Sequence, residues 1–252
     1  MKTVSELLKK SFGWPLLVWF GIFLLWNGAA GYFAGAVVLD QIDAATWNLV
    51  VMELIGIVLK IWFAGYLFLV AVRATQSVQN VLKPIDFKAS FVAGVRITCR
   101  FVFINLPLII LLAFSAWYDL FDVPYFFNAY TVLYLLFIII PFTLLLISKP
   151  VELSFMDGLW TFFKRNAGAC FSFTFFAALS YLVWFYVSSG IIALAQSYSI
   201  SMWTLAIAVL VPYFLLFYTA IFNAVLAGFY VAKINAKEKA LAGADKKEQK
   251  KK

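Results

Sequence analysis

The sequence predicts an all-α, polytopic helical membrane protein. Of its 252 residues, 65% are hydrophobic and only 13% are charged, whereas a soluble domain uses roughly 25% charged residues to cover its surface. The apolar residues form long continuous runs, without the short alternating segments of a membrane β-barrel. A helix needs about 20 such residues to cross the hydrocarbon core. Most of the chain is therefore expected to face lipid.

Six long apolar runs are the predicted transmembrane helices. They are residues 14–39, 48–72, 101–118, 128–148, 168–195 and 202–232. The first continues for about 26 residues, too long for a cleaved signal, so we expect it to be retained. The runs form one predicted domain, residues 1–236, without a separate soluble domain. The basic tail 237–252 is rich in Ala, Lys and Glu and lacks an apolar stripe, which predicts a frayed helix or disorder.

Lys and Arg in the short connections predict the orientation. Basic residues occupy the connections before the third and the fifth span, while the other three connections contain no Lys or Arg. Cytoplasmic loops carry the excess of Lys and Arg. The two basic connections are therefore expected inside, and both basic termini with them. The sequence predicts a protein of the plasma (inner) membrane with cytoplasmic N- and C-termini.

Short amphipathic segments precede spans 1, 3 and 5. The clearest covers residues 151–165, where one helical face is apolar and another is polar. The apolar face holds Val151, Phe155, Leu159 and Phe162, and the polar face holds Asp157, Thr161, Lys164 and Arg165. Such segments are expected to lie along the inner membrane surface as interfacial helices. The basic side chains that would contact the anionic lipids of the inner leaflet are Lys88, Arg96, Arg100, Lys164 and Arg165.

The segments before spans 3 and 5 share a motif, Ser90-Phe91-x-x-Gly94 and Ser154-Phe155-x-x-Gly158. It favours three units of an interfacial helix and a helical hairpin, the alternative being a chance match of two short patterns. With this layout the chain resembles a group of poorly characterised prokaryotic six-helix membrane proteins, similar to the membrane domain of some glycerophosphodiester phosphodiesterases. The resemblance implies an accessory or regulatory membrane module without their catalytic domain, and it carries over no functional residue.

The chain offers few groups for chemistry. It contains no histidine, which excludes histidine-based acid/base, triad and metal chemistry. Cys99 and Cys170 are its only thiols, and we interpret them as packing residues, without a disulfide or a metal site. The basic tail lacks the interleaved aromatic residues of a nucleic-acid-binding segment. We therefore expect no enzymatic activity, no cofactor, no metal and no nucleic-acid partner.

Glu53 and Lys60 are charged residues inside the second predicted span. Seven residues apart, they share one helical face about 10 Å from each other. Each charge costs about 2.5 to 3.5 kcal/mol at the membrane centre, so this face should point at other helices or at water. Either they line a polar cavity for an ion or headgroup, or they join an interhelical polar network. Candidate network partners are Asn27, Asn105, Tyr66, Tyr134, Thr143, Ser180 and Asn223.

Gly28, Gly31 and Gly35 in the first span would allow the close approach of another helix, within the bundle or in an oligomer. Two functions follow from these features. The first is an accessory, scaffolding or regulatory protein that acts through helix packing and through contacts with lipids, a protein partner or a second copy. The alternative is a transporter or channel component for a small ion, solute or lipid, with Glu53 and Lys60 in its path.

Overall fold

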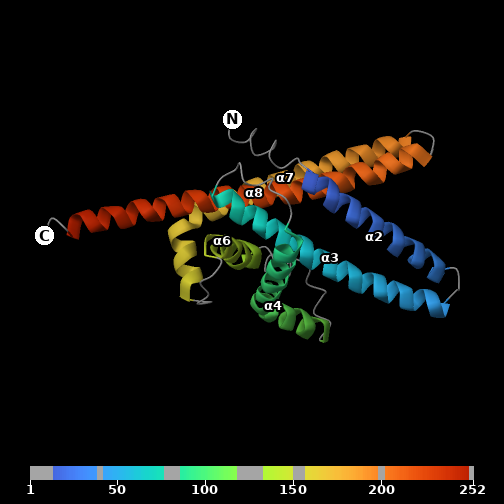
Figure 1. Ribbon diagram of the computed structural model, residues 1–252, viewed down its shortest axis with the longest axis horizontal. Helices are drawn as coiled ribbons and strands as arrows, with labels where there is room; N and C mark the ends of the chain where they lie inside the picture. The colour runs from blue at the N-terminus through green and yellow to red at the C-terminus, as the bar shows by residue number, and fades with distance from the viewer. Residues whose placement is uncertain are drawn as a thin grey trace. The chain divides into compact units, whose positions relative to one another are not determined.

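The computed structural model of the chain is helical throughout its regular regions (Figure 1). It describes residues 14–38, 42–76, 86–117, 133–149, 157–197 and 202–249, and no strand occurs among them. The elements are α2 (Trp14–Val38), α3 (Ile42–Gln76), α4 (Phe87–Trp117), the π-helical turn η3 (Leu135–Ile139), α6 (Ile140–Ser148), α7 (Asp157–Ser197) and α8 (Met202–Gln249). The predicted all-α fold class is confirmed for this part of the chain.

Five of the described helices contain stretches long and apolar enough to cross a membrane. These stretches are Trp14–Tyr32, Trp47–Gln76, Phe87–Leu106, Gly158–Ala195 and Ala206–Ala240. The region of the fourth predicted span, 128–148, holds a shorter apolar helix, Leu135–Ser148. Residues 128–132 lie outside the described part, so a sixth crossing stays a prediction.

The two predicted interfacial segments that can be followed in the structure differ from each other. α4 runs as one helix from Phe87 to Trp117, so the segment around Ser90 continues directly into the predicted third span. α7 contains a non-helical residue, Asn166 (φ −124°, ψ 18°), between the amphipathic segment and the predicted fifth span. The Asn166 side chain is buried and donates a hydrogen bond to the carbonyl of Phe162 (3.1 Å). Such a local side-chain bond offers the backbone an alternative to helix geometry. The segment before the first span lies outside the described residues.

The C-terminal tail, for which the sequence predicted a frayed helix or disorder, is helical. α8 continues to Gln249, through most of the predicted tail 237–252. The physical reason is local: Ala, Lys and Glu are strong helix formers, and they dominate this stretch. A tail can therefore lack an apolar stripe and still continue a helix that is already nucleated upstream.

The described contacts divide the chain into two compact units. Unit 1 consists of Met1–Leu69, Leu82–Arg100 and Trp184–Phe222, and unit 2 consists of Val70–Val81, Phe101–Val183 and Asn223–Lys252. The helices α3, α4, α7 and α8 each contribute residues to both units.

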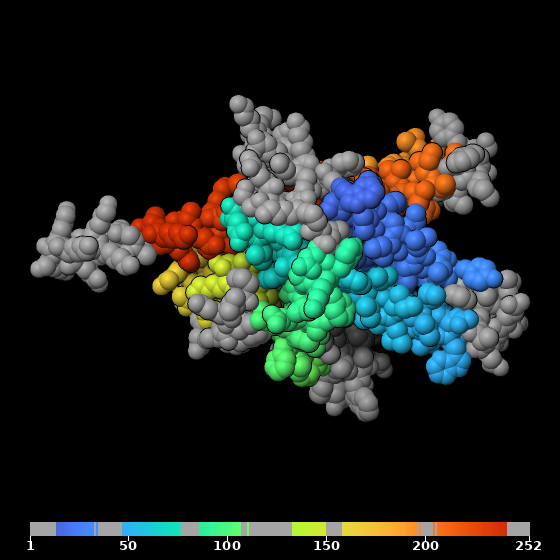
Figure 2. Space-filling model, in the orientation of Figure 1, coloured from blue at the N-terminus to red at the C-terminus, as the bar shows by residue number. Residues whose placement is uncertain are grey.

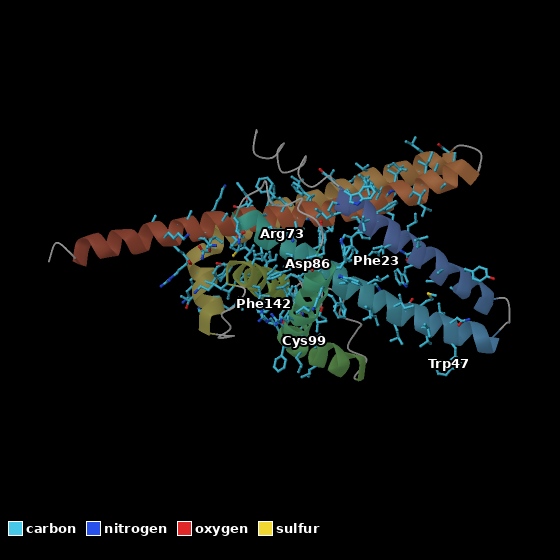
Figure 3. The ribbon with its side chains drawn as sticks, in the orientation of Figure 1. Phe23, Trp47, Arg73, Asp86, Cys99 and Phe142 are labelled. Carbon is cyan, nitrogen blue, oxygen red and sulfur yellow. The ribbon has the colours of Figure 1, made fainter. Side chains whose placement is uncertain are left out.

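An aromatic cluster forms the core of unit 1. Trp19 of α2 is fully buried, and its ring centroid lies 5.2 Å from that of Phe63 and 5.7 Å from that of Tyr66, both on α3. Phe217 of α8 joins them at 5.0 Å from Phe63, and Phe23, labelled in Figure 3, lies 5.1 Å from Phe217. Tilted and edge-on ring pairs of this kind each contribute about 0.5 to 1.5 kcal/mol beyond their buried area.

Unit 2 is built around α6 and the later part of α8. Five consecutive or near-consecutive residues of α6 are buried: Pro141, Phe142, Leu144, Leu146 and Ile147. Ala71 and Ala74 of α3 pass close beside Gly228 of α8. A Cβ on this glycine would lie 2.5 Å from the Ala74 Cβ and 3.1 Å from the Ala71 carbonyl carbon. At the end of α6, the Ser148 hydroxyl donates to the Asn235 side-chain oxygen (2.7 Å).

Candidate functional site

The indole of Trp26 on α2 contacts two residues of α3 in unit 1, Met52 and Lys60. Its Nε1 donates a hydrogen bond to the carbonyl of Met52 on α3 (2.8 Å). The Lys60 ammonium lies 5.2 Å from the centroid of the same ring. A cation at this distance is attracted by the negative face of the ring, by about 0.5 to 2 kcal/mol depending on how dry the site is. Trp26 therefore fixes α2 to α3 and gives the Lys60 charge a partner inside the chain.

Gly56 makes room for that indole. A Cβ at Gly56 would lie 2.7 Å from Cε2 and 3.0 Å from Cη2 of Trp26. Met52, Gly56 and Lys60 follow each other at four-residue intervals, so they occupy neighbouring positions along one side of α3. The indole therefore contacts α3 at three successive turns, at the Met52 carbonyl, at Gly56 and at the Lys60 ammonium.

Glu53 and Lys60 are both exposed on α3. Neither takes part in an ion pair or a hydrogen bond within the described part of the chain, and seven residues of helix separate them by about 10 Å. The structure therefore does not bring them together. Lys60 has its ring contact, whereas Glu53 has no polar partner among the described residues.

The polar residues that could have joined them are engaged elsewhere. Asn27 donates to the hydroxyl of Tyr213 on α8, Tyr134 donates to the carbonyl of Ile104 on α4, and Ser180 donates to the side-chain oxygen of Asn223 (3.1 Å). Tyr66 is buried in the aromatic cluster of unit 1. Asn105 donates to the carbonyl of Phe101 one turn back in α4 (2.6 Å), and Thr143 of α6 donates to the carbonyl of Ile139 at the end of η3 (2.8 Å). Interhelical polar contacts thus exist among the described residues, but none of these reaches Glu53 or Lys60.

Two glycines that the sequence did not single out as packing residues carry the contact between α3 and α4 in unit 1. A Cβ on Gly65 would lie 2.6 Å from the Gly94 Cα, and one on Gly94 would lie 2.9 Å from the Ile61 carbonyl carbon. Phe91 packs edge-on against Trp62 with their centroids 5.7 Å apart. Ser90 is almost completely buried here. The motif Ser90-Phe91-x-x-Gly94 is therefore the α4 side of a helix crossing, in which small residues allow backbone contact.

Asp86 fixes the start of α4 at this crossing (Figure 3). Its carboxylate accepts a hydrogen bond from the backbone N–H of Ala89 (2.9 Å), as an N-cap residue does. The indole Nε1 of Trp62 donates to the carbonyl of Phe87 (2.9 Å). In the second copy of the motif, Gly158 has no atom within 4 Å of a built Cβ, so the two glycines do not play the same packing role.

Two of the three predicted packing glycines of α2, Gly28 and Gly31, face open space. A Cβ at Gly28 or Gly31 would meet no atom within 4 Å, so the expected contact inside the bundle is not found at these two positions. The surroundings of Gly35 lie outside the described side chains. A role of Gly28 and Gly31 in an oligomer stays a prediction. Among the glycines that the structure describes, those in close contact are instead Gly56, Gly65, Gly94 and Gly228.

The predicted lipid-contacting residues lie at the surface of both units. Lys88 and Arg96 of α4 are exposed and Arg100 is half-buried, while Lys164 and Arg165 of α7 are exposed. On the short α7 segment before Asn166, Leu159 and Phe162 are buried, and Thr161 lies on the exposed side with Lys164 and Arg165. The predicted amphipathic faces are present in this described segment. Trp160, which is 56% exposed, holds the Lys164 ammonium 5.1 Å from its ring centroid.

Some buried polar atoms of the described residues have no hydrogen-bond partner: Trp19 Nε1, Ser188 Oγ and Asn223 Nδ2. They lie on three different helices, α2, α7 and α8. No group of three or more His, Cys, Asp or Glu side chains suited to a metal ion occurs among the described residues. Cys170 is buried, as a packing residue would be, and Cys99 is exposed.

No family model, curated protein or solved structure matches this chain. The class of protein therefore follows from the helices alone. Five described helices that can cross a membrane by length and composition support a polytopic helical membrane protein.

Proposed function

We propose that this protein is a non-catalytic accessory, scaffolding or regulatory subunit of the inner membrane, which acts through helix packing and contacts with lipid and with a protein partner. In this proposal the chain crosses the membrane six times and both termini are cytoplasmic. The positive charge of the connections supports the orientation. The apolar helix Leu135–Ser148 supports the additional crossing.

The observation that carries the proposal is that aromatic side chains fill the interior of unit 1. Rings from α2, α3 and α8 fill it, with Trp19, Phe23, Phe63, Tyr66 and Phe217 in mutual contact. A transport path needs polar groups that converge on water or on a substrate. Asn27, Asn105 and Ser180 are instead bound to a neighbouring side chain or to a nearby carbonyl. The two charged residues inside the second predicted span, Glu53 and Lys60, are exposed. This distribution favours a protein that binds lipids and partners at its surface over one that encloses a transport path.

Contacts with the inner leaflet are the second part of the proposal. The segment of α7 before Asn166 exposes Trp160, Lys164 and Arg165 beside its buried apolar face. An indole next to cationic side chains is the combination that favours the membrane–water boundary. We propose that this segment lies at the cytoplasmic boundary and contacts anionic headgroups.

Native mass spectrometry of the full-length protein, extracted gently from its own membranes, tests the proposal. We expect a stoichiometric protein partner, together with retained anionic lipid. The lipid should decrease in the double variant Lys164→Gln/Arg165→Gln and should persist in the charge-preserving control Lys164→Arg/Arg165→Lys. A protein without partner that carries a solute across proteoliposomes, with a flux lost in Glu53→Gln, would instead establish the transporter alternative.

A further inference from the structure

One exposed stripe of α3 combines the spacing of a helix–helix contact with two charges. Val50, Glu53, Ile57 and Lys60 follow at intervals of three and four residues, the spacing at which side chains share one face of a helix. Val50 is 45% and Ile57 is 49% exposed, and both charged residues are exposed as well. Figure 2 shows α3 open along much of its first part in this view.

Hydrocarbon chains alone are an unfavourable environment for the two charges of this stripe. Lys60 lies thirteen residues after Trp47, about 20 Å along the helix axis. Trp47 is 73% exposed and projects from the first part of α3 (Figure 3), as does an indole at the membrane boundary. A hydrocarbon core of roughly 30 Å then leaves Lys60 about 10 Å from the opposite boundary. A lysine side chain reaches only about 6 Å, so Lys60 does not place its charge among the headgroups of either boundary. Val50 and Ile57 accept a hydrocarbon environment, but Glu53 and Lys60 need a polar partner.

A second copy of this chain is also a poor neighbour. Copies inserted in the same orientation and related by a twofold axis along the membrane normal place equal residues at equal depth. Glu53 would then face Glu53, and Lys60 would face Lys60. A self-complementary contact through this stripe therefore opposes like charges, which disfavours it.

We propose that the stripe Val50–Glu53–Ile57–Lys60 is the docking face for a transmembrane helix of a different protein. That helix carries a carboxylate at the depth of Lys60 and a basic or amide side chain at the depth of Glu53. Trp26 positions the Lys60 ammonium beside this face through its ring and its bond to the Met52 carbonyl. The inference rests on the accessory role proposed above and specifies where and by what chemistry the partner binds.

Photo-crosslinking in native membranes tests the docking face. The full-length protein carries Ile57→benzoylphenylalanine, and a matched control carries Phe175→benzoylphenylalanine, because Phe175 is 64% exposed on α7 outside the stripe. We expect one adduct of fixed mass from position 57 and none from position 175. Its yield should fall about tenfold or more in Lys60→Met and in Glu53→Gln and should be retained in Lys60→Arg.

A charge exchange completes the test. Peptide sequencing of the adduct identifies the acidic residue of the partner helix, and its replacement by lysine should restore the adduct of Lys60→Glu. An adduct with a second copy of this chain, an adduct with lipid only, or a yield that does not respond to the charge of residue 60 would overturn the docking face. A protein partner that still copurifies in these cases leaves the accessory role standing, whereas a purified monomer with solute flux removes both.

Discussion

Gly65 of α3 and Gly94 of α4 lie backbone against backbone, so that a Cβ on Gly65 would come within 2.6 Å of the Gly94 Cα. The atoms that would have to yield belong to the main chain of a neighbouring helix, which cannot rotate away as a flexible side chain can. Any side chain at either position therefore separates the two helices in unit 1.

Gly94→Ala and Gly65→Ala should each lower the free energy of unfolding by about 1 to 3 kcal/mol, because the added methyl group overpacks a backbone crossing. Gly190→Ala is the matched control, since a Cβ at this position of α7 meets nothing within 4 Å. It should leave stability unchanged or raise it by up to about 1 kcal/mol through helix propensity. Denaturant unfolding in a fixed detergent measures all three. Equal behaviour of Gly94→Ala and Gly190→Ala would contradict the crossing.

Trp26 and Lys60 should be energetically coupled. Trp26→Leu removes the ring beneath the Lys60 ammonium and the hydrogen bond to the Met52 carbonyl, whereas Lys60→Met removes only the charge. A double-mutant cycle of these two changes in unfolding experiments should give a coupling energy of about 0.5 to 2 kcal/mol. Trp26→Phe keeps a ring and should keep part of the coupling. A coupling of zero would show that Lys60 does not depend on the ring.

Gly31→Leu should leave the unfolding midpoint of the isolated chain almost unchanged, because the space around this glycine is open. Gly56→Leu should be strongly destabilising, since its side chain would occupy the place of the Trp26 indole. Size-exclusion chromatography with light scattering on the same samples reports the oligomeric state. A smaller assembly in Gly31→Leu alone would assign the open face of α2 to an oligomer contact, and a lower midpoint without a change in assembly would contradict the open surroundings.

Cysteine labelling tests the orientation. In a Cys99→Ser/Cys170→Ser background, Lys88→Cys should react with a membrane-impermeant maleimide only after the membrane is opened. Ser197→Cys, at the exposed end of α7, should react in intact cells, because the connection that follows it contains no Lys or Arg. The opposite pattern would reverse the predicted orientation.

The sequence predicts helices well here because continuous apolar runs leave few alternatives for the backbone in lipid. It also places a change in the α7 region near Asn166, where the pattern turns from amphipathic to uniformly apolar. It does not predict that α4 passes through the corresponding region without a break. The charge pattern is similar in the two segments, and the difference lies in local geometry around single residues such as Asn166.

The packing glycines show what a sequence pattern leaves open. Gly28, Gly31 and Gly35 are spaced as in a helix contact, yet the first two face open space. Gly56 and Gly65 are isolated in the sequence, and their importance depends on Trp26 and Gly94, which come from other helices. Among these close-packed glycines, only Gly94 lies in a motif that the sequence shows. Its role in packing becomes evident only from its contact with the Ile61 backbone. Likewise the shared face of Glu53 and Lys60 follows from helix periodicity, but the ring beside Lys60 does not.

The later part of α8 has a consequence for the charged end of the chain. Within unit 2, α8 runs from Asn223 to Gln249, which measures about 40 Å along the helix axis. This length exceeds the roughly 30 Å of a hydrocarbon core. Turns that lie in the core at the Asn223 end therefore leave the lysine-rich end outside it, at a distance that the helix itself sets.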